Sequence, residues 1–343
     1  MPRGVAIYIA IVLGSSWVLG GLVWLLQNSL TGQAKGLAGL LFLFVAVIPF
    51  ATVFFIHRSQ AAGNAYAGLV WGPTGWYWLL YLGGFLLAAL VLGAQLAIGA
   101  LHIDPTMGDY IAMNKAAALK SSGQKLPDSV NGTFVIVGWV TAWSALILGP
   151  WLGTAFGALG VFPQYGWLAR RLMVRNRAFA CIMLMLISAG IGVTAGLLDN
   201  PQMGDLSLPA RMALFALTAL APVPATFWVF LRTRSAVLAA MVSAAYGAGM
   251  TASFPFVSDY AVWLSSPQGG VASAAGILLL GIGLWVWQDP GGQDLTVAAV
   301  AQDGTPLTPA MLQQAQAYAV QGAGNSPPSP PLPQLPPAEP PAG

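Results

Sequence analysis

Long apolar stretches, separated by short polar segments, dominate the hydropathy pattern of the chain. A bilayer crossing by a helix needs roughly 20 apolar residues, and these stretches reach that length. They are continuous rather than alternating, which favours helices over the strands of a β-barrel. We predict about eight transmembrane helices, at residues 5–26, 36–56, 75–101, 133–160, 178–198, 212–231, 235–257 and 268–288.

Composition indicates the same class of protein. Hydrophobic residues make up 57% of the 343 residues and charged residues only 7%. An ordinary soluble domain has about 25% charged residues, and so few charges cannot cover a soluble core of this size. We therefore expect an all-α fold, a polytopic membrane helix bundle over residues 1–288.

The arginines and lysines that flank the short loops indicate the orientation. The first apolar stretch has no usual small-residue cleavage site before Leu26, so we interpret it as a retained helix rather than a signal peptide. With the N-terminus inside, more cations fall on the cytoplasmic side. We expect both termini in the cytoplasm and the chain in the bacterial inner (plasma) membrane. The cytoplasmic cations are then Arg3, Arg58, Arg170, Arg171, Arg175, Arg177, Arg232 and Arg234, and the outer ones Lys35, Lys115, Lys120, Lys125 and Arg211.

Two regions outside the predicted spans have recognisable composition. Residues 102–132 form the largest outer loop, in which 109–120 is helix-like. Residues 289–343 form a cytoplasmic tail, where a Thr cap and a Pro in the first turn predict a short helix over 308–320. Residues 325–343 are proline-rich, so we expect them to be extended and disordered. Their PxxP spacing can dock an aromatic groove, but a plain flexible tail is the simpler interpretation.

The predicted spans contain no Asp, Glu, Lys, Arg or His. Such a residue inside a membrane is costly and usually marks a function, so its absence argues against an ion or proton relay. The single cysteine, Cys181, excludes an intramolecular disulfide. His57 and His102 fall on opposite faces of the predicted bundle, and His102 with Asp104 and Asp109 is better interpreted as a polar loop than as a surface metal site. We predict no cofactor and no metal.

Small residues and prolines indicate how the helices pack. Gly153 and Gly157 in the fourth span, and Gly192 and Gly196 in the fifth, are spaced so that another helix can approach closely. Two closely spaced prolines should kink the sixth span. These features point to a packed bundle rather than to a particular ligand.

The order of several segments resembles the CPBP family, the Abi or CAAX-protease-like intramembrane proteases. The segments "YGW" and "LRTRS" are the specific parts of this resemblance, which covers roughly residues 5–288. The similar segments are SWVLGGLVWLL (16–26), AVIPFATVFFIHR (46–58), GWYWLLYLGGFLLAALVLG (75–93), LILGPWLGTAFGALG (146–160), QYGWLARRL (164–172) and FWVFLRTRSAVLAAMVSAAYGAG (227–249).

The resemblance implies a site in which paired glutamates and histidines activate a water, but this sequence departs at each of those positions. Water activation needs a general base, and glutamine cannot act as one. A proline there should also distort the helix turn. We therefore expect a degenerate family member whose cleft is partly filled by apolar replacements. The family's Glu-Glu pair falls on Pro163 and Gln164, its arginine on Leu168, one histidine on Ala195, and the last histidine and asparagine on Ser243 and Gly247.

This pattern predicts a catalytically inactive, CPBP-like protein that binds membrane proteins or peptides as an accessory subunit, scaffold or regulator. Expected partners are membrane lipids and another membrane protein; nucleic acid is excluded for a loop so close to lipid. Candidate contacts with lipid or a partner are Trp167, Arg170, Arg171, Arg175 and Arg177, although fixing the topology is the simpler role for these arginines.

Two alternatives remain open at this point. One is a peptidase or other enzyme that acts through outer-face aspartates rather than the family residues. The other is a small transporter or a lipid-binding bundle. The aspartates in question are Asp104, Asp109, Asp199 and Asp205.

Overall fold

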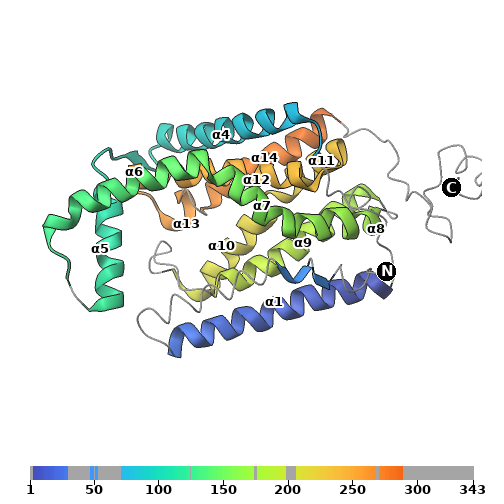
Figure 1. Ribbon diagram of the computed structural model, residues 1–343, viewed down its shortest axis with the longest axis horizontal. Helices are drawn as coiled ribbons and strands as arrows, with labels where there is room; N and C mark the ends of the chain where they lie inside the picture. Colours follow the sequence, from blue (N-terminus) through green and yellow to red (C-terminus); the bar gives the residue numbers. More distant parts are fainter. Residues whose placement is uncertain are drawn as a thin grey trace, which may run out of the picture. The chain divides into compact units, whose positions relative to one another are not determined.

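The computed structural model is mostly helical (Figure 1). All of the residues it describes belong to the unit Met1–Gln293. The predicted tail, with its helix over 308–320 and its proline-rich end over 325–343, lies outside the described residues, as does most of the predicted span 36–56. The structure describes residues 3–29, 47–49, 51–52, 71–123, 125–173, 176–197, 206–266 and 270–288.

Six helical segments in the described part are long and apolar enough to cross a membrane. A seventh apolar helix, α14 (Val271–Trp287), has 17 residues and is about 26 Å long. The segments support an integral membrane helix bundle, and the count of eight stays a prediction. The six are α1 (Arg3–Ser29), α4 (Thr74–Ala97), α6 (Asn131–Ile147) with the turn before it, α9 (Arg177–Ala195), the pair α10 (Leu208–Leu220) and α11 (Val223–Thr233), and α12 (Ala236–Ser253).

Proline divides two of the predicted spans. The continuous helix predicted over 133–160 is wrong: α6 ends at Ile147, and α7 (Gly149–Val161) begins with Pro150 in its first turn. Proline is favoured in the first turn because its missing N–H is not needed there. The predicted kink in span 212–231 is confirmed, since α10 and α11 are separated by a turn at Ala221 and Pro222.

Helix α12 lies at the centre of the bundle and packs against α7 through small residues. A Cβ built on Gly153 would lie only 3.0 Å from the Cβ of Ala244. Every position of this ladder is glycine on α7 and alanine on α12, so the two backbones can approach closely, as expected from the sequence for Gly153 and Gly157. The antiparallel pairs are Gly149 with Ala248, Gly153 with Ala244, and Gly157 with Ala240.

The opposite side of α12 packs in the same manner against α4, and α9 packs against α10 (Figure 1). A Cβ on Gly84 would lie 2.5 Å from the Cβ of Ala245, and one on Gly249 would lie 2.7 Å from that of Ala88. The expected close approach at Gly192 and Gly196 is also present, against the backbone of Phe215 and Met212 respectively. Glycine therefore determines which helices are neighbours.

A small non-membrane layer joins the ends of α4 and α12. Strand β1 (His102–Ile103) pairs antiparallel with β2 (Val257–Ser258), which follows the short helix η4 (Phe254–Phe256). Helix α5 (Gly108–Ser122) confirms the predicted helical character of 109–120. Buried Met107, Tyr110 and Phe254 form the core of this layer. The layer also contains η1 (Asp128–Val130) before α6 and α13 (Val262–Ser265) before α14.

Candidate functional site

The segment that the family resemblance marks as a reaction centre is a π-helix, η2 (Phe162–Ala169). It lies between α7 and the short helix α8 (Arg170–Met173). Pro163 cannot donate the hydrogen bond of a regular α-helical turn, and a π-turn accommodates that loss. The predicted distortion at Pro163 is therefore present. Every residue of η2 except Gln164 is buried.

Aromatic rings pack against or extend from the π-helix on two sides. The Trp167 ring lies 5.1 Å from the Tyr8 ring of α1, and the Arg171 guanidinium carbon lies 4.1 Å from the centroid of the Trp167 ring. On the other side, Tyr165 lies 5.8 Å from Phe227 and 6.1 Å from Phe230 of α11. These rings pack η2 against α1 and α11.

The side chains at the family positions differ in burial and in their place in the fold. Leu168 is completely buried, and Pro163 is buried beside it. Gln164 is only partly buried, and Ala195 lies at the far end of α9. Because Gly157 faces Ala240, η2 lies at the start of α12, whereas Ser243 and Gly247 lie about two and three turns further along it. The six positions therefore do not form one cluster.

The structure describes three of the side chains that were predicted to contact lipid or a partner protein. Trp167 is only 7% exposed, so its ring offers little surface to lipid or to a partner. Arg171 donates to the Trp167 carbonyl at 3.2 Å and is partly buried. Arg177 begins α9 and is partly exposed. The Arg170 side chain and Arg175 lie outside the described residues.

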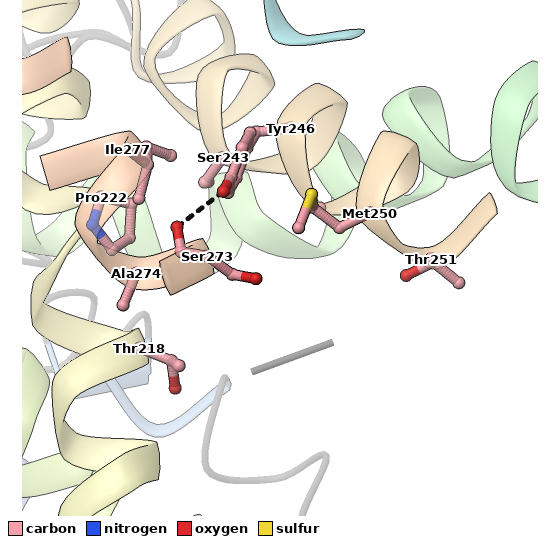
Figure 2. Close-up of a pocket in the computed structure, with 10 residues that line it drawn as sticks. Thr218, Pro222, Ser243, Tyr246, Met250, Thr251, Ser273, Ala274 and Ile277 are labelled. Atoms are coloured by element: carbon pink, nitrogen blue, oxygen red, sulfur yellow. Dashed lines mark hydrogen bonds between the residues drawn. The ribbon is translucent and has the colours of Figure 1, made fainter. Parts of the chain in front are cut away.

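A pocket of about 210 Å³ lies between α10, α12 and α14, at the break between α10 and α11 (Figure 2). Ser243 and Gly247, two of the six family positions, belong to its wall. The sequence analysis missed this pocket, although two prolines inside one apolar span were a signal for it. Its lining residues are Thr218, Pro222, Ser243, Tyr246, Gly247, Met250, Thr251, Ser273, Ala274 and Ile277.

Hydroxyl groups give the pocket its polarity, and among the residues that the structure describes no Asp, Glu, Lys, Arg or His lines it. Figure 2 shows the Tyr246 hydroxyl reaching α14, where it donates to the Ser273 carbonyl at 2.6 Å. The Ser243 hydroxyl donates to the Ala240 carbonyl at 3.2 Å. The described part of its wall therefore offers hydroxyl groups and apolar side chains to a ligand.

The outer-face aspartates of the enzyme hypothesis stabilise loops. Asp104 accepts hydrogen bonds from the hydroxyl and the N–H of Thr106 and from the N–H of Gly108, at 2.5, 2.9 and 2.5 Å. The Thr106 hydroxyl first, and then these N–H groups, lower the pKa of the Asp104 carboxyl. Asp109 accepts from the Asp259 N–H at 3.0 Å.

The same outer layer contains Tyr260, whose pKa is raised to about 12 by burial and, to a lesser extent, by the Asp109 charge. Asp199 and Asp205 lie outside the described residues. Within the described ranges, no group of three or more His, Cys, Asp or Glu side chains could hold a metal ion. In the described structure, Asp104 therefore caps the start of α5, and Asp109 holds the backbone at Asp259.

No protein-family model, curated protein or solved structure matches this chain. The resemblance to the CPBP family therefore rests on the quoted sequence segments alone.

Proposed function

We propose that this chain is a non-catalytic, CPBP-like integral membrane protein that binds another membrane protein or a membrane peptide, as an accessory subunit, scaffold or regulator. One observation carries the proposal: the segment where the family resemblance would require carboxylates is a buried π-helix filled by Pro163, Leu168 and aromatic rings. A group with a tunable pKa is the minimum for water activation. In this proposal the bundle therefore serves binding rather than hydrolysis.

The proposed setting is a bacterial inner membrane with both termini in the cytoplasm. Contacts between helix ends are compatible with that topology. The Ser235 hydroxyl contacts the Trp71 carbonyl at 3.4 Å, so the starts of α4 and α12 lie at the same end of the bundle. The Trp228 indole donates to the Gln288 carbonyl at 2.9 Å, which places the end of α14 beside α11. In the proposed topology this end faces the cytoplasm.

Photo-crosslinking from exposed faces of the bundle tests the proposal. We would place p-benzoyl-phenylalanine singly at Leu90, Phe156, Ile182 and Leu279, which are 62%, 61%, 55% and 66% exposed on α4, α7, α9 and α14. After irradiation of native membranes, one face should give a discrete adduct with a membrane protein. The other faces should give only lipid adducts and so serve as matched controls. Lipid adducts from all four positions would overturn the proposal.

The pocket favours a second candidate function, a lipid-binding bundle. Its wall combines hydroxyls with apolar side chains such as Met250 and Ile277. Lipid-only crosslinking from the four outer faces, together with a lipid retained in the pocket, would favour this function over protein binding.

A further inference from the structure

The packing of the bundle leaves one row of residues on α12 open. Close glycine–alanine contacts with α7 and α4 cover two faces of this helix. Ser243, Gly247 and Thr251 are spaced four residues apart, so they lie on one further face. All three are partly exposed, and a Cβ built on Gly247 meets nothing within 4 Å. The row is about 12 Å long and lies parallel to the axis of a membrane-spanning helix.

Apolar side chains form the deep part of this groove, which is the pocket of about 210 Å³. Met250, Ala274 and Ile277 are only 2%, 3% and 3% exposed and belong to one hydrophobic cluster. Pro222 lines another side, near the middle of the apolar segment Leu208–Thr233. Non-helical backbone at membrane depth is tolerated where it lines a cavity. The pocket is therefore an elongated groove at membrane depth.

The hydroxyl groups of the wall direct most of their hydrogens into the protein. Four of them donate to a backbone carbonyl, so an apolar occupant leaves these four donors satisfied. Figure 2 shows the remaining hydroxyl residue, Thr251, at one end of the wall beyond Met250. The four donations are Thr218 to Phe215 at 3.0 Å, Ser243 to Ala240 at 3.2 Å, Tyr246 to Ser273 at 2.6 Å and Ser273 to Ser266 at 3.0 Å.

The size and the apolar part of the pocket indicate what kind of molecule fits it. Its volume of about 210 Å³ equals roughly seven waters at about 30 Å³ each. A buried water needs about two to four polar partners, and the side chains of Met250, Ala274 and Ile277 offer none of useful strength. Methylene groups that pack along these side chains gain van der Waals contacts instead. A lipid tail is the apolar chain that a membrane supplies at this depth.

We propose that this groove binds one acyl chain of a membrane lipid, whose head group stays outside the pocket. The chain lies along Gly247 and packs against Met250, Ala274 and Ile277. The shape of the groove, and not the chemistry of the head group, selects the ligand. This inference rests on the second candidate function, the lipid-binding bundle, and it does not depend on a protein partner at the outer faces.

Gly247 offers a way to close the groove without disturbing its walls. Because a Cβ built there meets nothing within 4 Å, Gly247→Leu should fill the groove rather than push helices apart. Gly93 on α4 is also open, but it is exposed and is not one of the lining residues. Gly93→Leu is therefore the matched control.

The experiment uses the full chain in phosphatidylcholine nanodiscs that contain a small fraction of a photoreactive phosphatidylcholine. One probe carries a diazirine in the middle of an acyl chain, and a second carries it on the head group. Mass spectrometry locates the labelled residues. The acyl-chain probe should label Met250 and Ile277, which are almost inaccessible from the outside of the bundle, as well as Leu279, which is 66% exposed. The head-group probe should leave Met250 and Ile277 unlabelled.

The variants test whether the labelled chain lies in the groove. Gly247→Leu should reduce labelling of Met250 and Ile277 about tenfold or more, because a leucine and an acyl chain cannot share the space. Labelling of Leu279 should be unchanged in this variant. Gly93→Leu should be labelled like the unsubstituted chain at all three residues.

Three results would overturn the proposal. Labelling of Leu279 without Met250 and Ile277 would show that water or another group fills the groove. Equal labelling of Met250 by the head-group probe would show that the head, and not the chain, enters. Undiminished labelling in Gly247→Leu would show that the chain binds elsewhere. None of these results changes the crosslinking of a protein from the outer faces, so the failure of this inference and the failure of the proposed function can be told apart.

Discussion

Two of the prolines in the described bundle, Pro163 and Pro222, have opposite effects on the packing around them. At Pro163 the helix widens into a π-turn, and the side chains that follow are buried against α1 and α11. At Ala221 and Pro222 a turn separates α10 from α11, and a pocket lies between α10, α12 and α14. A proline at membrane depth is therefore not a site by itself. Aromatic rings pack against the π-turn at Pro163, whereas a pocket with Ser243, Gly247 and Ala274 in its wall lies beside Pro222.

Cavity-creating substitution should give the largest difference between the two regions. Leu168→Ala in the filled region should lower the free energy of unfolding by about 2–5 kcal/mol, because surrounding side chains cannot collapse fully. Thr251→Ala in the pocket wall should cost about 1 kcal/mol or less. Thermal unfolding of the purified chain in detergent checks both values. Equal losses would contradict the distinction between a filled and an open region.

Enlarging a glycine should also cost more stability at a packed position than in the pocket wall. Gly153→Leu should destabilise the bundle by about 1–3 kcal/mol, because its Cβ would already touch Ala244 at 3.0 Å. Gly247→Leu, on the helix that Gly153 contacts, should leave stability unchanged or slightly raised, since leucine is the better helix former. Measuring the melting temperatures of Gly153→Leu and Gly247→Leu in detergent tests this ranking. Strong destabilisation by Gly247→Leu would show that the pocket has no room for a leucine side chain.

Arg171, the cation beside the π-helix, should contribute less to the free energy of unfolding. Arg171→Met removes the guanidinium from the Trp167 ring and its bond to the Trp167 carbonyl, and should cost about 0.5–2 kcal/mol. Arg171→Lys keeps a charge but loses the planar group that stacks on the ring, so it should recover only part of this loss. Unfolding in detergent is again the measurement. If Arg171→Met were as stable as the unsubstituted chain, the contact between Arg171 and Trp167 would not contribute to stability.

Lowering the pH should not directly change the stability of either proline region. We expect a small effect at the start of α5, where Asp104 is ionised. The pKa of Asp104 is lowered from its ordinary value of 3.8, so its ionised form stabilises the start of α5. That contribution is complete above this value and is lost as pH falls below it. Hydrogen-exchange protection of residues 108–112 should decrease in acid, and Asp104→Asn should already show low protection at neutral pH. A pH-independent protection would contradict this role.

The sequence predicted the membrane class, the helix over 109–120 and several close helix contacts, because apolar runs and glycine spacing are patterns within short stretches of sequence. The ladder at Gly153 and Gly157 is one example, and the kink at the prolines of span 212–231 is another. It missed the division of span 133–160, because Pro150 interrupts a run that is uniformly apolar. It also missed the pocket, since Thr218, Ser243 and Ser273 come from three helices whose packing no local pattern encodes.

The central claim is that this bundle binds a membrane protein and does not carry out hydrolysis. Native mass spectrometry of the full chain, released from native membranes in mild detergent, tests it most directly. The account predicts a complex of the 35.6 kDa chain with one other membrane protein at a fixed ratio, unchanged by Gly247→Leu. A lone chain carrying only lipid would contradict the claim, and the pocket would then provide its main function.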